Sequence, residues 1–223
     1  MIRFFDILFS SLAILILSPL FIVVILILRF TGEGEIFFLQ DRMGMGHKKI
    51  KIFKFVTMRK NSSQIGGNIT IKDDPRILPV GNFLRKTKIN ELPQLFNIFL
   101  GSMSVIGPRP QTISCFEAFP KESQEKITMV KPGLSGIGSV IFRSEEEILD
   151  NQEENLNFYN NIIAPYKGKV ETWFVNNVSV SNYFLLIFIT VIIIALPKSQ
   201  IVWKIFKDLP EPPAKLKKLL NYS

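Results

Sequence analysis

The chain has 223 residues, of which 47% are hydrophobic and 21% charged, and its formal net charge is +8. This apolar content excludes an intrinsically disordered chain, and a single cysteine and a single histidine exclude an internal disulfide framework and a zinc site of the Cys/His type. Any metal must therefore be held by oxygen atoms, which favours Mg²⁺ or a similar ion.

The basic residues are concentrated in residues 29–100 and again in 198–223, whereas 143–171 are acidic. We see no nucleic-acid-binding motif. Beside strongly apolar segments, such a charge pattern predicts anionic lipid or a phosphorylated substrate as partner, and no nucleic acid.

Residues 7–28 form an uncharged apolar segment. As a helix it would reach about 33 Å, enough to cross a hydrocarbon core of about 30 Å. Pro19 at its midpoint removes a backbone donor and kinks the helix, and Ser18 can satisfy the freed carbonyl. A cleaved signal peptide fits less well, because the segment is long and no A-x-A site follows. The residues alone leave a spanning helix and a re-entrant hairpin equally open.

Residues 36–39 and 50–57 read as two strands. Lysine and isoleucine alternate from Lys49 to Ile52, which is the period of a strand with one wet face. Gly44 and other turn residues lie between the two segments, so we predict a β-hairpin. Polar, glycine-rich residues 60–70 predict a loop.

Residues 87–110 predict a helix followed by a stiff loop. Ile89, Leu92 and Leu95 begin an apolar series at helical spacing. Asn90 is expected to cap this helix, and Gly101 to end it. Taken singly, Asn90 is most often only a cap, Glu91 a first-turn acid and Arg109 a loop charge.

Basic residues on both sides of this helix suggest that the region could also bind phosphate. Arg85, Lys86 and Lys88 come just before the predicted helix, and Arg109 lies in a Gly-Pro-Arg-Pro loop after it. A helix N-terminus beside cations is a ready phosphate site, and a guanidinium pairs well with phosphate oxygens.

A second apolar segment covers residues 183–196. At about 21 Å it is too short to span a membrane. An interfacial helix is our first expectation and a core helix the second. A proline-rich break at 210–213 separates it from a basic tail suited to a membrane surface.

The order of these motifs resembles the bacterial sugar transferases that start glycoconjugate assembly, the monotopic phosphoglycosyl transferases. The matching positions, in chain order, are Ser18 and Pro19, then residues 51–59, 74–76, 81–87, 91–95, 101–104, 107–110 and 131–136. The resemblance covers residues 1–143, and the run 85–110 is its most specific part.

The resemblance implies an α+β, mostly helical fold with a short β-hairpin. It also implies a re-entrant membrane anchor at residues 1–30, a catalytic domain at 31–171, and an apolar interfacial helix with a basic tail at 172–223. The chain would lie in the bacterial inner membrane, in contact with phospholipid, with its active site on the cytoplasmic face. Basic residues 29–60 favour the same placement and argue against a signal-anchored protein with a periplasmic domain.

The implied reaction moves a sugar-1-phosphate from a UDP-sugar to undecaprenyl phosphate, with Mg²⁺ as cofactor. UMP leaves, and the product begins a polysaccharide, O-antigen or glycoprotein glycan. A homo-oligomer is compatible with the sequence.

The family opens its catalytic helix with an Asp-Glu pair whose Asp is the nucleophile, and here Asn90 replaces that Asp. Four explanations compete. Glu91 or another carboxylate such as Asp74 attacks; the transfer is direct, without an enzyme-bound intermediate; an Asp-to-Asn change was introduced; or the chain is a catalytically silent relative that binds lipid or serves as a scaffold. We favour an active variant.

The remaining site residues take their roles from the same resemblance. Glu91 would hold Mg²⁺ or act as the carboxylate of the pair, and Arg85 and Arg109 would bind phosphates. Arg143 would touch the nucleotide, or else pair with the acidic residues that follow it. Lys54 would bind pyrophosphate, or else be a solvated strand charge.

Overall fold

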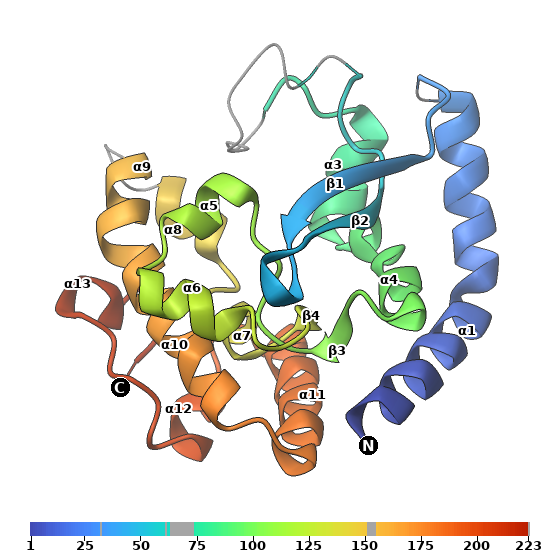
Figure 1. Ribbon diagram of the computed structural model, residues 1–223. Helices are drawn as coiled ribbons and strands as arrows, with labels where there is room; N and C mark the ends of the chain where they lie inside the picture. Colours follow the sequence, from blue (N-terminus) through green and yellow to red (C-terminus); the bar gives the residue numbers. More distant parts are fainter. Residues whose placement is uncertain (32, 61, 63–73, 151–154, 223) are drawn as a thin grey trace.

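The computed structural model describes the chain apart from residues 32, 61, 63–73, 151–154 and 223 (Figure 1). The loop predicted at 60–70 falls almost entirely on residues outside this description. The described chain is mostly helical with two short two-stranded sheets, which confirms the predicted mixture of elements.

The N-terminal apolar segment forms one long helix, α1 (Ile2–Thr31), which is long and apolar enough to cross a membrane. Pro19 lies inside it, and the two halves of α1 meet at an angle in Figure 1. The Ser18 hydroxyl donates to the carbonyl of Leu15 at 2.8 Å, which is the carbonyl that an N–H at position 19 would otherwise serve. The predicted break is therefore a kink in a continuous helix, and the re-entrant hairpin stays a prediction.

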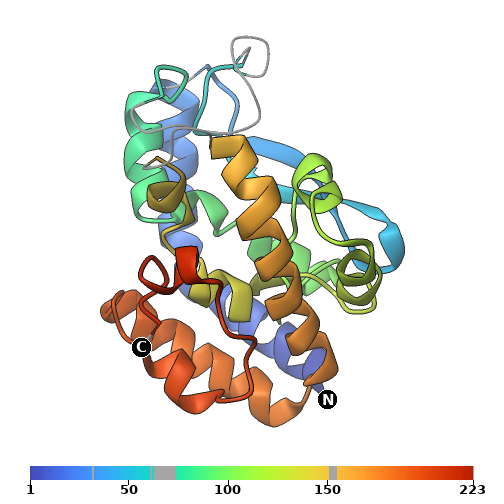
Figure 2. The same ribbon diagram turned by 90° about the vertical axis from the view of Figure 1, so that its left-hand side faces the viewer.

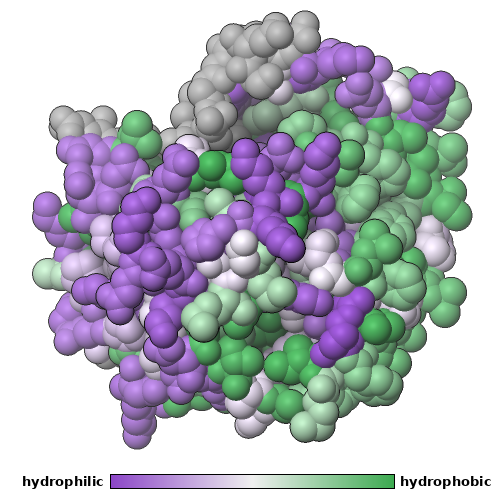
Figure 3. All heavy atoms as spheres, viewed as in Figure 1, coloured by the Kyte–Doolittle hydropathy of each residue, from purple (hydrophilic) through white to green (hydrophobic). Residues whose placement is uncertain are grey.

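One side of α1 packs against the rest of the molecule. Phe21, Val24 and Leu28 form a cluster with Phe55 and Leu84. Many other apolar side chains of α1 are exposed, from Phe4 near its start to Phe30 near its end. In Figure 3 hydrophobic residues gather on the side where α1 lies in Figure 1, and hydrophilic residues on the opposite side.

The predicted hairpin is confirmed. Strands β1 (Phe37–Met43) and β2 (Lys49–Phe55) pair antiparallel. The turn η1 (Met45–His47) joins them, and Gly46 within it has φ +66°, a left-handed conformation that glycine adopts without strain. β2 brings one of its lysines to the site described below.

Three short helical elements follow the turn at Asp74. They are α3 (Pro79–Lys86), η2 (Ile89–Glu91) and α4 (Gln94–Leu100). Gly101 ends α4 with φ 95°, as predicted. The expected single helix from Asn90 is in fact a 3₁₀ turn followed by a separate helix.

A second small sheet was not foreseen from the sequence. β3 (Ser104–Ile106) pairs parallel with β4 (Gly133–Ser135). The Gly107 N–H donates to the Ser135 carbonyl at 2.9 Å, and a Cβ on Gly107 would lie 2.5 Å from a backbone carbonyl oxygen. This close approach positions the loop that carries Arg109.

The rest of the chain is a group of helices packed around one apolar core. They are α5 (Ile113–Glu117), α6 (Lys121–Ile127), α7 (Ile137–Ile141), α8 (Glu145–Asp150), α9 (Asn155–Phe158), η3 (Tyr159–Ile163), α10 (Ala164–Asn176), α11 (Val180–Ala195), α12 (Ile201–Ile205) and α13 (Ala214–Lys217). Figure 2 shows α10 running across one side of the molecule with α11 below it, and α10 contacts α6 and α7.

The second apolar segment forms α11, and one of its faces confirms the expectation of a core helix, while its interfacial position stays a prediction. Leu186 and Ile189 are fully buried in the core, while Phe188 and Val191 are exposed. The basic tail also packs inward, because Leu216 and Leu220 are buried. One face of α11 therefore belongs to the core, and its other face is free for an apolar surrounding.

Candidate active site

The centre of the candidate site is the carboxylate of Glu91. Its Oε1 lies 2.7 Å from Nη2 of Arg109 and 3.8 Å from Nζ of Lys54. The exposed fractions of these side chains are 15% for Glu91, 16% for Lys54 and 35% for Arg109. The group thus lies at the surface on the Arg109 side and is enclosed on the Lys54 side.

Three different elements bring these residues together. Glu91 ends the turn η2, which follows Lys88 in a left-handed conformation with φ 59°. Lys54 comes from β2 and Arg109 from the loop after β3. Since the chain separations are large, the ion pairs form only when the hairpin, the turn and the loop are packed together.

The charges perturb one another strongly. Burial alone raises the pKa of Glu91, but the cations Arg109 and Lys54 outweigh it and lower this pKa to about 2. Burial lowers the pKa of Lys54 to about 7, against the opposing effect of Glu91. Glu91 is therefore ionised at neutral pH, whereas Lys54 loses its proton near pH 7.

Arg42 adds a further cation that sequence reasoning missed. It lies on β1, and its guanidinium donates to the carbonyl of Pro110 at 3.3 Å. Burial, with the charge of Arg109 as a smaller cause, lowers the pKa of Arg42 to about 10. Its position in a strand of mixed polarity offers no signal that it would face the loop of Arg109.

Arg85 lies in the same neighbourhood. Its guanidinium is 3.5 Å from Oγ1 of Thr57, and its charge contributes to lowering the pKa of both Lys54 and Asp74. The site thus carries a surplus of positive charge around one carboxylate, which is an arrangement that attracts phosphate groups.

Asn90 does not cap α4, contrary to the expectation. It lies within η2, and the residue before α4 is Pro93, which makes no side-chain cap. Asn90 is 8% exposed, and among the described residues its Oδ1 has no hydrogen-bond partner. The physical reason is that the chain makes a tight turn at Ile89–Glu91 before α4 begins. Among the described residues, Oδ1 is therefore an acceptor without a donor, on the residue that precedes Glu91 in the chain.

Two other predicted residues lie in different settings. Asp74 is bound by the guanidinium of Arg76, with Oδ2 2.6 Å from Nη2, and this bond lowers the pKa of Asp74 to about 2. Arg143 donates to the carbonyl of Ile193 near the end of α11, at 2.5 Å. The structure thus ties Arg143 to α11, and Glu145, one of the acids expected as its partner, pairs with Lys167 instead, while the nucleotide contact stays a prediction.

Glu171 is a second acidic residue that the sequence reasoning did not select. It lies on α10, and its Oε1 accepts a hydrogen bond from the backbone N–H of Arg109 at 3.3 Å. The sequence feature that could have indicated Glu171 is an acidic residue on the apolar, buried face of a helix.

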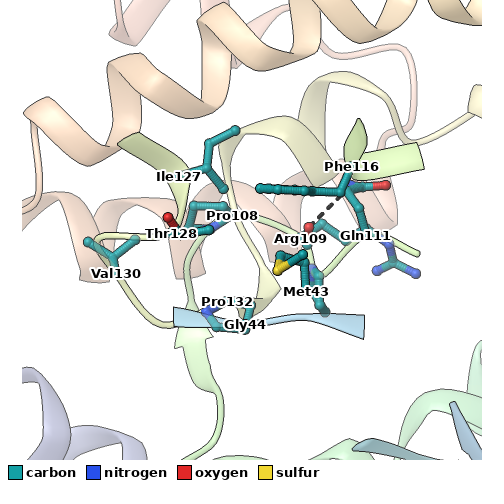
Figure 4. A pocket seen from close by; sticks show the side chains of 11 residues that line it. Met43, Gly44, Pro108, Arg109, Gln111, Phe116, Ile127, Thr128, Val130 and Pro132 are labelled. Carbon is teal, nitrogen blue, oxygen red and sulfur yellow. Dashed lines mark hydrogen bonds between the residues drawn. The ribbon is translucent and has the colours of Figure 1, made fainter. Parts of the chain in front are cut away.

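A small pocket lies against the same loop. Its wall includes Met43 of β1, Pro108, Arg109, Gln111 and Phe116 of α5 (Figure 4). Gln111 donates from Nε2 to the carbonyl of Arg109 at 3.2 Å, which is the dashed line in Figure 4. The backbone of Arg109 is therefore held on both its N–H and its carbonyl.

Comparison with known proteins points to one family. The family model described as "Bacterial sugar transferase" matches residues 1–196. The chain is 36% identical over 161 residues to a UDP-glucose:undecaprenyl-phosphate glucose-1-phosphate transferase of Klebsiella pneumoniae, a match that covers 70% of this chain and 34% of that protein.

Two further relatives match a similar region. A UDP-N-acetylgalactosamine-undecaprenyl-phosphate N-acetylgalactosaminephosphotransferase of Aeromonas hydrophila is 38% identical over 62% of this chain and 33% of its own length. The exopolysaccharide production protein PSS of Rhizobium leguminosarum bv. phaseoli is 38% identical over 62% of this chain and 72% of its own length. The chain thus matches about a third of the first two relatives and most of the third.

Proposed function

Because the chain belongs to the bacterial sugar transferase family, we propose that it transfers a sugar-1-phosphate from a UDP-sugar to undecaprenyl phosphate and releases UMP. The product would start a polysaccharide or a related glycoconjugate. The observation that carries this proposal is the set of cations around Glu91, which suits two phosphorylated substrates.

In this reaction the bond between the β-phosphorus and the oxygen bridging to UMP breaks. A bond between the β-phosphorus and an oxygen of the acceptor phosphate forms. Negative charge grows on the leaving UMP, and positioned cations lower the barrier by offsetting it. In this proposal Arg109 and Arg85 bind phosphate oxygens and Lys54 binds the pyrophosphate, and the contacts that gather these cations near Glu91 and Thr57 support it.

The attacking group in this proposal is the acceptor phosphate itself. Asn90 is a neutral amide, and Glu91 is bound to two cations that hold its pKa at about 2. A carboxylate stabilised in this way is a weak nucleophile. The direct transfer therefore fits this site better than an enzyme-bound intermediate on Glu91 or on Asp74, which Arg76 binds through its Nη2 and Nε.

Mg²⁺ fits the oxygen atoms at this site. Mg²⁺ is usually held by one or two carboxylates together with substrate phosphates and water. Glu91 supplies a carboxylate, and the buried Oδ1 of Asn90, which lacks a partner among the described residues, is a second oxygen on the adjacent residue. When bound, the ion would neutralise pyrophosphate charge.

The proposed location is the cytoplasmic face of the bacterial inner membrane. The exposed apolar sides of α1 and α11 support contact with phospholipid. The basic residues 29–60 support a cytoplasmic site, and the kink at Pro19 supports a re-entrant anchor.

The test is UMP release from a panel of UDP-sugars, with undecaprenyl phosphate and Mg²⁺ in detergent. This chain and its Asn90→Asp variant are assayed side by side, with Glu91→Gln as the inactive control. Turnover of one donor by this chain supports the proposal and identifies the sugar. Turnover by Asn90→Asp alone shows an intact but silent site. No turnover by either variant favours a scaffold that binds lipid.

A further inference from the structure

Glu171 on α10 lies behind the active-site loop and is almost completely enclosed. Its side chain is 1% exposed. Oε1 accepts from the Arg109 N–H at 3.3 Å, and Oε2 has no hydrogen-bond partner among the described residues. Space for the carboxylate exists because residue 138 is a glycine, on which a Cβ would lie 2.2 Å from Oε1. The helix α7 is thus shaped around this acid.

A buried acid without full pairing is costly to keep. The charges that face Glu171 come from its own helix, from α8 and from the loop. Lys167 lies one turn earlier on α10, is itself 2% exposed, and pairs with Glu145 of α8 at 2.6 Å. Burial raises the pKa of Glu171 to about 7, and the charges of Lys167 and Arg109 oppose this rise.

Arg109 contacts both acids: its backbone N–H donates to Glu171, and its guanidinium donates to Glu91. Arg109 stands between Pro108 and Pro110, two residues without a backbone N–H. Its N–H is bound to Glu171, and its guanidinium lies 2.7 Å from Glu91. A shift of this backbone therefore moves the guanidinium away from the carboxylate and from any phosphate bound beside it.

We propose that Glu171 is a positioning residue, which holds the backbone of Arg109 so that its guanidinium stays on Glu91 and on the substrate phosphates. The effect on turnover rests on the proposed function, but the hold on the loop does not. Misplacement of such a group by about 1 Å can cost about a hundredfold in rate.

The experiment uses three variants of the full chain. Glu171→Ala removes the acceptor, and Glu171→Gln keeps an acceptor oxygen but no charge. Val170→Ala is the matched control, because Val170 is a fully buried neighbour on the same helix and belongs to the apolar core. Hydrogen exchange of a peptide covering residues 105–112 reports on the loop, and UMP release is measured from pH 6 to pH 8.

We expect faster exchange in the loop and about a hundredfold lower kcat for Glu171→Ala. Above pH 7 Glu171 is ionised and its bond from Arg109 is charge-assisted, whereas below pH 7 the acid resembles the amide. The rate of the unmodified chain relative to Glu171→Gln is therefore expected to fall from about fivefold at pH 8 to about one at pH 6.

Two results would overturn the proposal. One is that Val170→Ala lowers kcat and loosens the loop as much as Glu171→Ala does, since the effect would then be one of general stability. The other is an unchanged loop exchange in Glu171→Ala. If the unmodified chain releases no UMP, the proposed function fails, while the exchange measurement still decides the hold of Glu171 on Arg109.

Discussion

At the scale of single residues, the burial of Lys54 makes the stability of the protein depend on pH. The pKa of Lys54 falls from 10.5 to about 7 in the folded protein. Between these values the unfolded chain binds one more proton than the folded chain, so this lysine makes stability rise with pH by about 1.4 kcal/mol per unit. Lys54→Met removes this slope. Thermal unfolding in detergent from pH 7 to pH 10 measures the difference, and equal slopes in both proteins would contradict the assignment.

Arg109 is the cation with the shortest contact to Glu91. Arg109→Ala is expected to lower kcat/KM for UMP release by about 10²- to 10³-fold, because it removes a positioned charge from the transition state. Arg109→Lys keeps the charge but loses the planar fork, so it should recover only part of the loss. Lys48→Ala, an exposed lysine in the hairpin turn, serves as the control and should leave the rate unchanged.

Because the side chain at position 90 is neutral, we also predict that the sugar-1-phosphate passes directly to the acceptor, without an enzyme-bound intermediate. A direct transfer cannot exchange labelled UMP into the UDP-sugar unless the acceptor is present, whereas a covalent intermediate permits it. We expect no exchange by this chain without undecaprenyl phosphate. Exchange without acceptor would show that a group of this chain forms an intermediate. Asn90→Asp is the comparison, because it restores a carboxylate at that position.

At the scale of elements, the local sequence pattern predicted a strand, a helix end and a helix kink correctly, because each of these features has a single local physical cause. Alternating lysine and isoleucine marks β2 because a strand with one wet face has period two. Gly101 marks the end of α4 because its left-handed conformation suits glycine. The kink at Pro19 follows from a missing donor.

The elements that were missed depend on contacts between distant parts of the chain. β3 and β4 are three residues each and pair across about 30 residues of chain, so neither has a pattern of its own. Asparagine is a residue type that often caps helices, yet Asn90 lies inside the turn η2, and its side-chain Oδ1 has no hydrogen-bond partner among the described residues. Glu171 becomes a site residue only because α10 packs behind the loop of Arg109.

Asp6 joins α1 to the rest of the molecule. Its Oδ1 accepts from Oγ of Ser104 at 2.9 Å, from N of Val105 at 2.9 Å and from the hydroxyl of Tyr183 at 3.0 Å. Asp6→Ala leaves three donors without this acceptor, two of them buried and one partly buried, and is expected to cost about 3 kcal/mol, while Tyr183→Phe should cost about 1 kcal/mol. Thermal unfolding in detergent measures both, and an equal loss for the two would show that Asp6 contributes only through Tyr183.

At the scale of the whole molecule, the proposed membrane contact combines the kinked α1 with the exposed face of α11. The exposed apolar side chains of α1 lie on the side of the molecule where Figure 3 shows hydrophobic residues gathered. An anchor that returns to its side of entry would keep the N-terminus and the catalytic domain on the same face. A spanning helix would place them on opposite faces.

Pro19→Ala is expected to straighten α1 toward a spanning helix, because it restores the backbone donor to the carbonyl of Leu15. In a Cys115→Ser background, one cysteine is placed before Met1 and, in a second protein, at Lys48→Cys in the hairpin turn. With Pro19 present, an impermeant maleimide should label neither cysteine in intact cells and both after lysis. With Pro19→Ala, the N-terminal cysteine should become labelled from outside, while Lys48→Cys stays protected.

The Lys48→Cys arm separates a change in the anchor from a change in the whole topology. If both cysteines become accessible in the Pro19→Ala protein, the cells are leaky or the domain has been exported, and the kink has not been tested alone. Labelling of the N-terminal cysteine with Pro19 still present would show a spanning α1. Unchanged protection in Pro19→Ala would show that contacts of Phe21, Val24 and Leu28 with the domain, rather than the proline, hold α1 on its side of entry.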